Sequence, residues 1–95
     1  MTHQRLLKIN EAAAALLSVG AKEVYIFGSA ADGTDRDDSD VEFAVTGLPA
    51  ALFFKAMGLA RRLIRKPVDL IDLDESNPFT DYLKKHGALK RVAGY

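Results

Sequence analysis

The stretch from Phe27 to Glu42 constrains this chain more than any other part of its sequence. It joins a small-residue turn, Gly28-Ser29, to a loop dense in carboxylates and then to a strand-like segment that carries Asp40 and Glu42. A glycine and a serine at the end of a buried strand leave backbone N–H groups open to a phosphate. Two acids at positions i and i+2 of a strand point to one face and can hold one hard metal ion together. The pattern indicates metal-assisted transfer from a nucleoside triphosphate.

Length, charge and residue types exclude several classes of protein. The 95 residues predict one domain, 1–95, because a single core rarely divides at this size. The 13 basic and 13 acidic side chains cancel, so we expect no nucleic acid and no membrane as a partner. The absence of cysteine and the wide separation of His3 and His86 argue against disulfides and against a zinc site. Without a membrane-spanning run or the apolar segment of a signal peptide, the expected location is the cytoplasm.

The spacing of apolar residues predicts alternating helices and strands. Helices are expected over residues 4–17, 50–65 and 77–86, the first with Leu6 and Ile9 on its apolar face. Strands are expected over residues 22–27, 41–45 and 68–73, and residues 88–92 fit either an edge strand or a last helical turn. The helix between the second and third strands implies a right-handed crossover that makes these strands parallel, and the short link before them implies an antiparallel pair. The expected fold class is therefore α+β (with an α/β crossover): a small mixed sheet of three to four strands flanked by helices.

A third acid completes the candidate site. Asp69 begins the third strand, and in the right register its carboxylate faces the same cleft as Asp40 and Glu42. It would serve there as a third metal ligand or as the base that takes the proton from an attacking hydroxyl. Gly28 and Ser29 would hold the triphosphate through backbone N–H groups and the serine hydroxyl.

These residues resemble a known family. The pattern Gly28-Ser29, ten residues, Asp40-x-Glu42 and then Pro67-Val68-Asp69-Leu70-Ile71-Asp72-Leu73 looks like the minimal nucleotidyltransferase (MNT) family of the polymerase-β superfamily, over nearly the whole chain. The resemblance implies the polymerase-β-like nucleotidyltransferase fold, with magnesium bound by Asp40 and Glu42 and with Asp69 completing a triad. It also implies magnesium-dependent transfer of AMP, or another nucleotide, from a triphosphate such as ATP to an acceptor hydroxyl. Many stand-alone members resemble antitoxins that pair with a HEPN-domain ribonuclease toxin and neutralise it by adenylylating a tyrosine, so the expected partners are ATP and a HEPN toxin, in an oligomer with that partner.

Two positions depart from the family pattern. Residue 42 is Glu where the family usually has Asp, and the extra methylene moves the carboxylate by roughly 1 Å, while productive sites are held within about 0.5 Å. Ala30-Ala31-Asp32 replaces a segment that usually carries arginine, which removes positive charge near the triphosphate. Two hypotheses therefore stay open: an adenylyltransferase with a weakened site, or an inactive module of this fold that neutralises its partner by binding alone. Nucleotidyl transfer to a small molecule is a third, less favoured option, because no second domain is expected to hold such an acceptor.

Other features of the sequence have plainer interpretations. We expect Asp35, Asp37 and Asp38 to be solvated loop acids, and Asp72 and Asp74 to be caps or surface residues. A calcium EF-hand loop is excluded because Asp40 occupies its required glycine position, and a P-loop is excluded because no lysine precedes Thr34.

The segment predicted as the second long helix carries a basic and an aromatic cluster. Its basic residues are Arg61, Arg62, Arg65 and Lys66. They most simply form a wet helix face, with an acidic protein partner as the second interpretation and RNA as the third. The large apolar residues Phe53, Phe54 and Met57 are expected mostly in the core, although an exposed Phe54 would indicate a partner surface.

Overall fold

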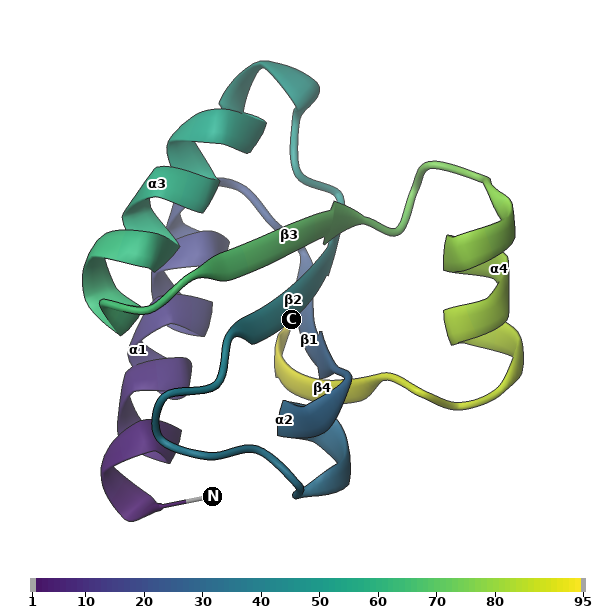
Figure 1. The fold of residues 1–95 in the computed structure, drawn as a ribbon. Coiled ribbons are helices and arrows are strands. Elements are labelled where there is room, and N and C mark those ends of the chain that lie inside the picture. Colours follow the sequence, from purple (N-terminus) through teal and green to yellow (C-terminus); the bar gives the residue numbers. More distant parts are fainter. Residues whose placement is uncertain (1, 95) are drawn as a thin grey trace.

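In the computed structural model, which describes residues 2–94, a four-stranded mixed sheet lies between two unequal groups of helices (Figure 1). The strands are β1 (Glu23–Phe27), β2 (Val41–Thr46), β3 (Val68–Asp72) and β4 (Lys90–Gly94). The α-helices are α1 (His3–Val19), α2 (Ser29–Asp32), α3 (Phe53–Ile64) and α4 (Pro78–Lys85), and a 3-10 turn, η1 (Ala50–Leu52), leads into α3. The expected α+β class is confirmed, and the segment that fitted two interpretations is the edge strand β4.

The strand order in the sheet is β3-β2-β1-β4. β2 and β3 are parallel, as the crossover through α3 requires, and β1 is antiparallel to both β2 and β4. The register places Phe27 opposite Glu42, and Glu42 in turn opposite Asp69. Glu42 therefore lies between the end of β1 and the start of β3.

Helices α1 and α3 cover one face of the sheet and build the main core. The alternation of β2 turns Val41, Phe43 and Val45 into this core, where none is measurably exposed. A smaller cluster under α4 on the opposite face contains Phe27, Ala44, Leu73 and Leu83. The same alternation turns Glu42 toward this second, less covered face.

Local sequence signals set the ends of the helices. The Thr2 hydroxyl accepts the Arg5 N–H at the start of α1, and Asn77 caps α4 in a reciprocal pair with Thr80. At the end of α3, Arg65 takes a left-handed conformation, with φ of 60°. Pro67 follows two residues later and disfavours a helical conformation at Lys66, so the helix does not continue.

Two expectations about exposure were wrong. Phe54 was expected mostly in the core, but 81% of it is exposed, because it lies on the outer side of the first turn of α3. Leu6 was expected on the apolar face of α1, but it is 42% exposed, and the neighbouring Arg5 points inward instead. Amphipathic spacing alone cannot fix which of two adjacent residues faces the sheet.

Asp35 corrects a third expectation. It was expected to be a solvated loop acid, but its side chain is 0% exposed and pairs with Arg5 of α1. A buried carboxylate and a buried guanidinium each require a partner, and this partner is distant in sequence. Asp37 and Asp38 are exposed, as expected.

The remaining surface residues follow their simple interpretations. Arg61, Arg62, Arg65 and Lys66 are all exposed. The Asp72 carboxylate accepts the Asp74 N–H at 2.9 Å, and Asp74 accepts the Gly47 N–H at 2.6 Å, so both acids stabilise turns.

Candidate functional site

Two parallel strands bring the three candidate acids to one end of the second sheet face. Asp40 comes directly before β2, Glu42 is its second residue, and Asp69 is the residue of β3 paired with Glu42. Side chains two residues apart, and side chains paired across neighbouring strands, share a face of the sheet. Their face is opposite the one that Val41 and Phe43 pack into the core.

The three carboxylates influence one another electrostatically. Partial burial, and then the nearby charges of Asp69 and Asp40, raise the pKa of Glu42 above its ordinary value. Asp40 and Asp69 are themselves exposed. Among residues 2–94, however, no three His, Cys, Asp or Glu side chains are close enough together to form a ready metal site. The three acids therefore lie in one region of the sheet face, but their carboxylates are not gathered around one metal position.

Gly28 forms the other side of this region. The chain turns there with φ of 66° and ψ of −144°, a conformation open essentially to glycine alone. A Cβ built at this position would overlap the Glu42 carboxylate, so that carboxylate lies against the glycine backbone. The first N–H groups of the helix that follows, at Ser29 and Ala30, have no intrahelical acceptors.

A cavity of about 480 Å³ opens beside Gly28 and Glu42. It is lined by Phe27, Gly28, Ala31, Asp32, Glu42, Phe79, Tyr82, Leu83, Gly87, Ala88, Leu89 and Lys90. Ser29, Asp40 and Asp69 are not among the lining residues, so only two of the predicted site residues reach it. Its aromatic wall is half-exposed, since Phe79 is 48% and Tyr82 55% exposed.

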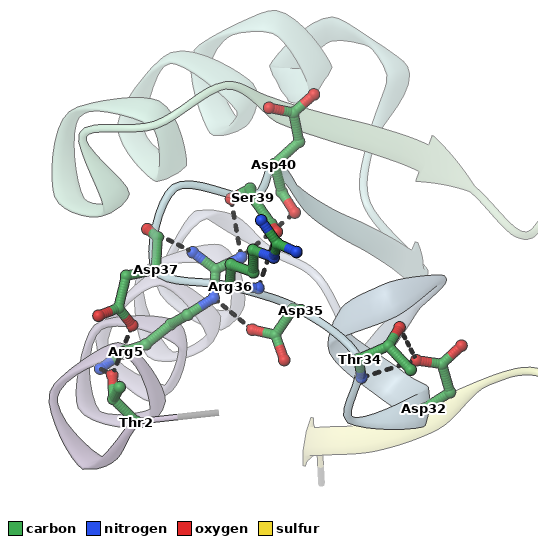
Figure 2. Close-up of polar contacts among 9 residues, drawn as sticks. All are labelled: Thr2, Arg5, Asp32, Thr34, Asp35, Arg36, Asp37, Ser39 and Asp40. Carbon is green, nitrogen blue, oxygen red and sulfur yellow. Dashed lines mark hydrogen bonds and ion pairs between the residues drawn. The ribbon is translucent and has the colours of Figure 1, made fainter.

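Charges of both signs line this cavity. The Thr34 hydroxyl at 2.6 Å, and then the Thr34 N–H at 3.0 Å, donate to Asp32 and lower the pKa of its carboxyl, so Asp32 is ionised at neutral pH (Figure 2). Asp32 thus lines the cavity as a carboxylate, beside Glu42, whose pKa is raised. Lys90, at the start of β4, is the one basic residue among its lining residues. Reasoning from the sequence missed Lys90, because the strand that carries it was ambiguous.

Arg5 is a second residue that sequence reasoning missed. Its side chain, 6% exposed, lies between α1 and the loop that leads into β2. It donates to the carboxylate of Asp35 and to the carbonyl oxygens of Asp37, Ser39 and Asp40 (Figure 2). Arg5 lies four residues, about one helical turn, before Ile9 on the buried stripe of α1, a spacing that is compatible with burial but does not by itself select Arg5 over Leu6.

Comparison with known families supports the fold and the chemistry class. The family profile described as "Polymerase beta, Nucleotidyltransferase" matches residues 8–89. No curated protein matches the chain. Residues 2–94 contain no helix of the length and apolarity needed to cross a bilayer.

Solved structures share the architecture at low sequence identity. A toxin–antitoxin crystal structure with AMP-PNP is 22% identical and superposes with a TM-score of 0.70, over 90% of this chain and 73% of that one. A candidate minimal nucleotidyltransferase is 24% identical with a TM-score of 0.66, over 90% of this chain and 95% of that one. The MNT antitoxin in complex with a tri-AMPylated HEPN toxin of Shewanella oneidensis is 18% identical with a TM-score of 0.65, over 100% of this chain and 74% of that one. At these identities the matches establish a common fold.

Proposed function

The chain belongs to the polymerase β nucleotidyltransferase family, and on that premise we propose that it is an antitoxin that transfers AMP from ATP, with magnesium, to a tyrosine hydroxyl of a HEPN toxin. The observation that carries the proposal is the register that sets Glu42 opposite Asp69, with Asp40 two residues earlier on the same face. The nucleotide and the partner are supported by the solved complexes of the same fold, one with AMP-PNP and one with an AMPylated HEPN toxin.

The donor chemistry of the three acids suits magnesium. Carboxylate oxygens are the ligands that this ion prefers, and Asp40, Glu42 and Asp69 would hold it. Partial burial and then the charges of Asp69 and Asp40 raise the pKa of Glu42, and a divalent cation would relieve the repulsion among the three carboxylates. Exposed side chains change rotamer readily, so Asp40 and Asp69 can turn toward Glu42 when the cation arrives. A bound ion would neutralise part of the charge on the triphosphate.

The residues around the cavity would bind the rest of the nucleotide. The N–H groups after Gly28 and the hydroxyl of Ser29 would donate to phosphate oxygens. Lys90 would offset the negative charge that Asp32 adds where the family usually has arginine. The rings of Phe79 and Tyr82 offer apolar faces on which a nucleobase can stack.

The transfer itself is a displacement at the α-phosphorus of ATP. The acceptor hydroxyl oxygen forms a bond to that phosphorus, and the bond from the α-phosphorus to the oxygen that bridges it to the β-phosphorus breaks, so that pyrophosphate leaves. The proton of the hydroxyl goes to a base, and Asp69 is the candidate for this role or for that of third metal ligand. The acceptor must approach from the solvent side, where Asp40 and Asp69 are exposed.

Neutralisation by binding alone is the second candidate function. It is favoured by the Glu42 carboxylate, which lies against the turn where the phosphates would bind, with ionised Asp32 lining the same cavity. It is also favoured by Phe54, which is 81% exposed beside a groove between the start of α3 and β3. Exposed aromatic residues of this kind are typical of protein interfaces.

One experiment separates the two functions. The protein is incubated with ATP labelled at the α-phosphate, magnesium and a HEPN toxin, and both toxin labelling and residual ribonuclease activity are measured. Adenylyl transfer predicts labelling that Asp40→Ala and Asp69→Ala abolish and that Asp38→Ala, an exposed acid of the same loop, retains. Toxin neutralised by Asp40→Ala without any label would instead establish binding alone.

A further inference from the structure

Arg5 ties the start of α1 to the loop that delivers Asp40. Its Nε donates to Asp35 Oδ2 at 2.5 Å, and its Nη1 donates to the Asp37 carbonyl at 3.2 Å. Its Nη2 donates to the carbonyl oxygens of Ser39 at 2.8 Å and Asp40 at 3.3 Å (Figure 2). All three guanidinium nitrogens are therefore used on one loop.

The loop from Gly33 to Asp40 depends on such ties, because it has no helix or strand of its own. Residues 36–39 close a local turn through the Ser39 N–H to the Arg36 carbonyl and the Arg36 N–H to Ser39 Oγ. That turn does not fix where the loop lies relative to the sheet. The connection to α1 comes from Arg5 and from an exposed hydrogen bond of 3.0 Å between Thr2 and Asp37.

The chemistry of Arg5 suits it to holding the loop, and not to contacting the nucleotide. A planar guanidinium presents several donors in a fixed fork, whereas a lysine ammonium is a point charge without that geometry. The Arg5 nitrogens are occupied by the loop, and Arg5 does not line the cavity beside Gly28 and Glu42. Arg5 therefore cannot meet the triphosphate there.

We propose that Arg5 is a positioning residue, which holds Asp40 at the start of β2 so that its carboxylate can share a divalent cation with Glu42 and Asp69. The inference rests on the proposed function, since that function makes Asp40 a metal ligand. Sites of this kind need their ligands held within about 0.5 Å of the productive geometry. Replacing a residue that orients a metal ligand typically weakens metal affinity by about 10- to 100-fold. The carbonyl of Asp40 is itself one of the Arg5 acceptors, so the tie reaches the ligand residue directly.

The test uses the protein without ATP or toxin. Mg²⁺ and Mn²⁺ are titrated by calorimetry, and amide hydrogen exchange of residues 35–40 is measured, for wild type, Arg5→Lys and the matched control Arg36→Lys, an exposed arginine of the same loop. Arg5→Lys is expected to weaken cation affinity about tenfold and to speed exchange in the loop, while Arg36→Lys changes neither. In an Asp40→Asn background, Arg5→Lys is expected to cause no further loss of affinity, because its effect acts through Asp40.

Several outcomes would overturn the inference. They are equal cation affinity in wild type and Arg5→Lys, a loss of affinity that is undiminished in the Asp40→Asn background, and a wild type that binds no divalent cation. If Arg5→Lys does not fold, Asp35→Asn serves instead, since it keeps an oxygen acceptor for Arg5 Nε but removes the charge, and unchanged affinity there would count against the proposal. Weakened cation binding in Arg5→Lys, with no transfer to a toxin by the wild type, would support the role of Arg5 and refute the proposed function. Unchanged cation binding in Arg5→Lys, with transfer by the wild type, would refute the role of Arg5 and support the proposed function.

Discussion

The carboxylate of Glu42 lies against the backbone of Gly28, in the space that a side chain at position 28 would fill. The pairing of Phe27 with Glu42 across β1 and β2 brings the two residues together, because the chain turns at Gly28 directly after that pair. The contact joins the turn expected to hold phosphates to the acid expected to hold a metal ion. The contact can therefore be tested by substitutions at Gly28 and at Glu42.

Gly28→Ala is expected to destabilise the fold by about 1–3 kcal/mol from backbone strain alone, with a further loss from overlap with Glu42. Urea unfolding of Gly28→Ala, Glu42→Ala and the double variant separates the backbone strain from the overlap. Glu42→Ala should remove the cost of the overlap and leave the cost of the strain. Gly33→Ala is a control without overlap, because Gly33 has positive φ, of 83°, in the left-handed region, and a Cβ there meets nothing within 4 Å. Equal losses at both glycines would contradict the contact with Glu42.

Glu42→Gln is expected to raise the melting temperature at pH 7 in the absence of metal. The pKa of Glu42 is raised in the folded state, so protonation favours folding. The stability that protonated Glu42 provides is fully present below its unfolded pKa of about 4.5. It is lost as pH rises through the pKa of Glu42 in the folded state. The advantage of Glu42→Gln should therefore shrink as pH falls toward 4.5, as thermal melts between pH 4 and 8 would show. A constant difference across this range would contradict it.

Glu42→Asp is expected to increase kcat/KM for adenylyl transfer several-fold, and Glu42→Gln to abolish transfer. Removing one methylene draws the carboxylate back from Gly28 by roughly 1 Å and opens the turn to the phosphates. Initial rates at saturating magnesium would measure the change. A lower kcat/KM in Glu42→Asp would show that the site is built around the longer side chain.

Lys90→Ala is expected to raise the KM for ATP about tenfold, with kcat changed less than about twofold, because a charge-assisted bond to a phosphate binds ground state and transition state alike. Lys90→Arg should retain most of the affinity. Lys85→Ala, an exposed lysine that does not line the cavity, serves as the control. A fall in kcat at unchanged KM would give Lys90 a different role.

Phe54→Ser is expected to leave the melting temperature within about 2 °C of wild type, since exposed substitutions change stability little, and to weaken binding of the HEPN toxin about tenfold or more. Calorimetry with the toxin measures the affinity, and Lys55→Ser, the exposed neighbour, provides the control. Undiminished affinity in Phe54→Ser would place the interface on another surface.

The elements and the strand directions were predictable because they depend on local patterns. The spacing of apolar residues predicted the helices and strands, and the kind of link between strands indicated whether neighbouring strands run parallel. Periodicity predicted that Asp40, Glu42 and Asp69 share a face, and the register of β2 with β3 pairs Glu42 with Asp69. Their roles as ligands remain a prediction.

Other features depend on residues that meet only after folding. Nothing near Asp35 in the sequence shows that a guanidinium thirty residues earlier will bury it. Lys90 lines the cavity only because β4 returns to the edge of β1. Phe54 is exposed because the rotation of α3 on the sheet is set by packing rather than by composition.

The sequence by itself determined the fold class and the position of Asp40, Glu42 and Asp69 at the start of β2 and β3, since periodicity and spacing act within a single element or between adjacent ones. The tertiary structure alone decided that Glu42 lies on Gly28 and that Arg5 holds the loop before Asp40. These contacts depend on side chains of different elements that meet only in the folded chain, where burial and electrostatic pairing select one partner among many.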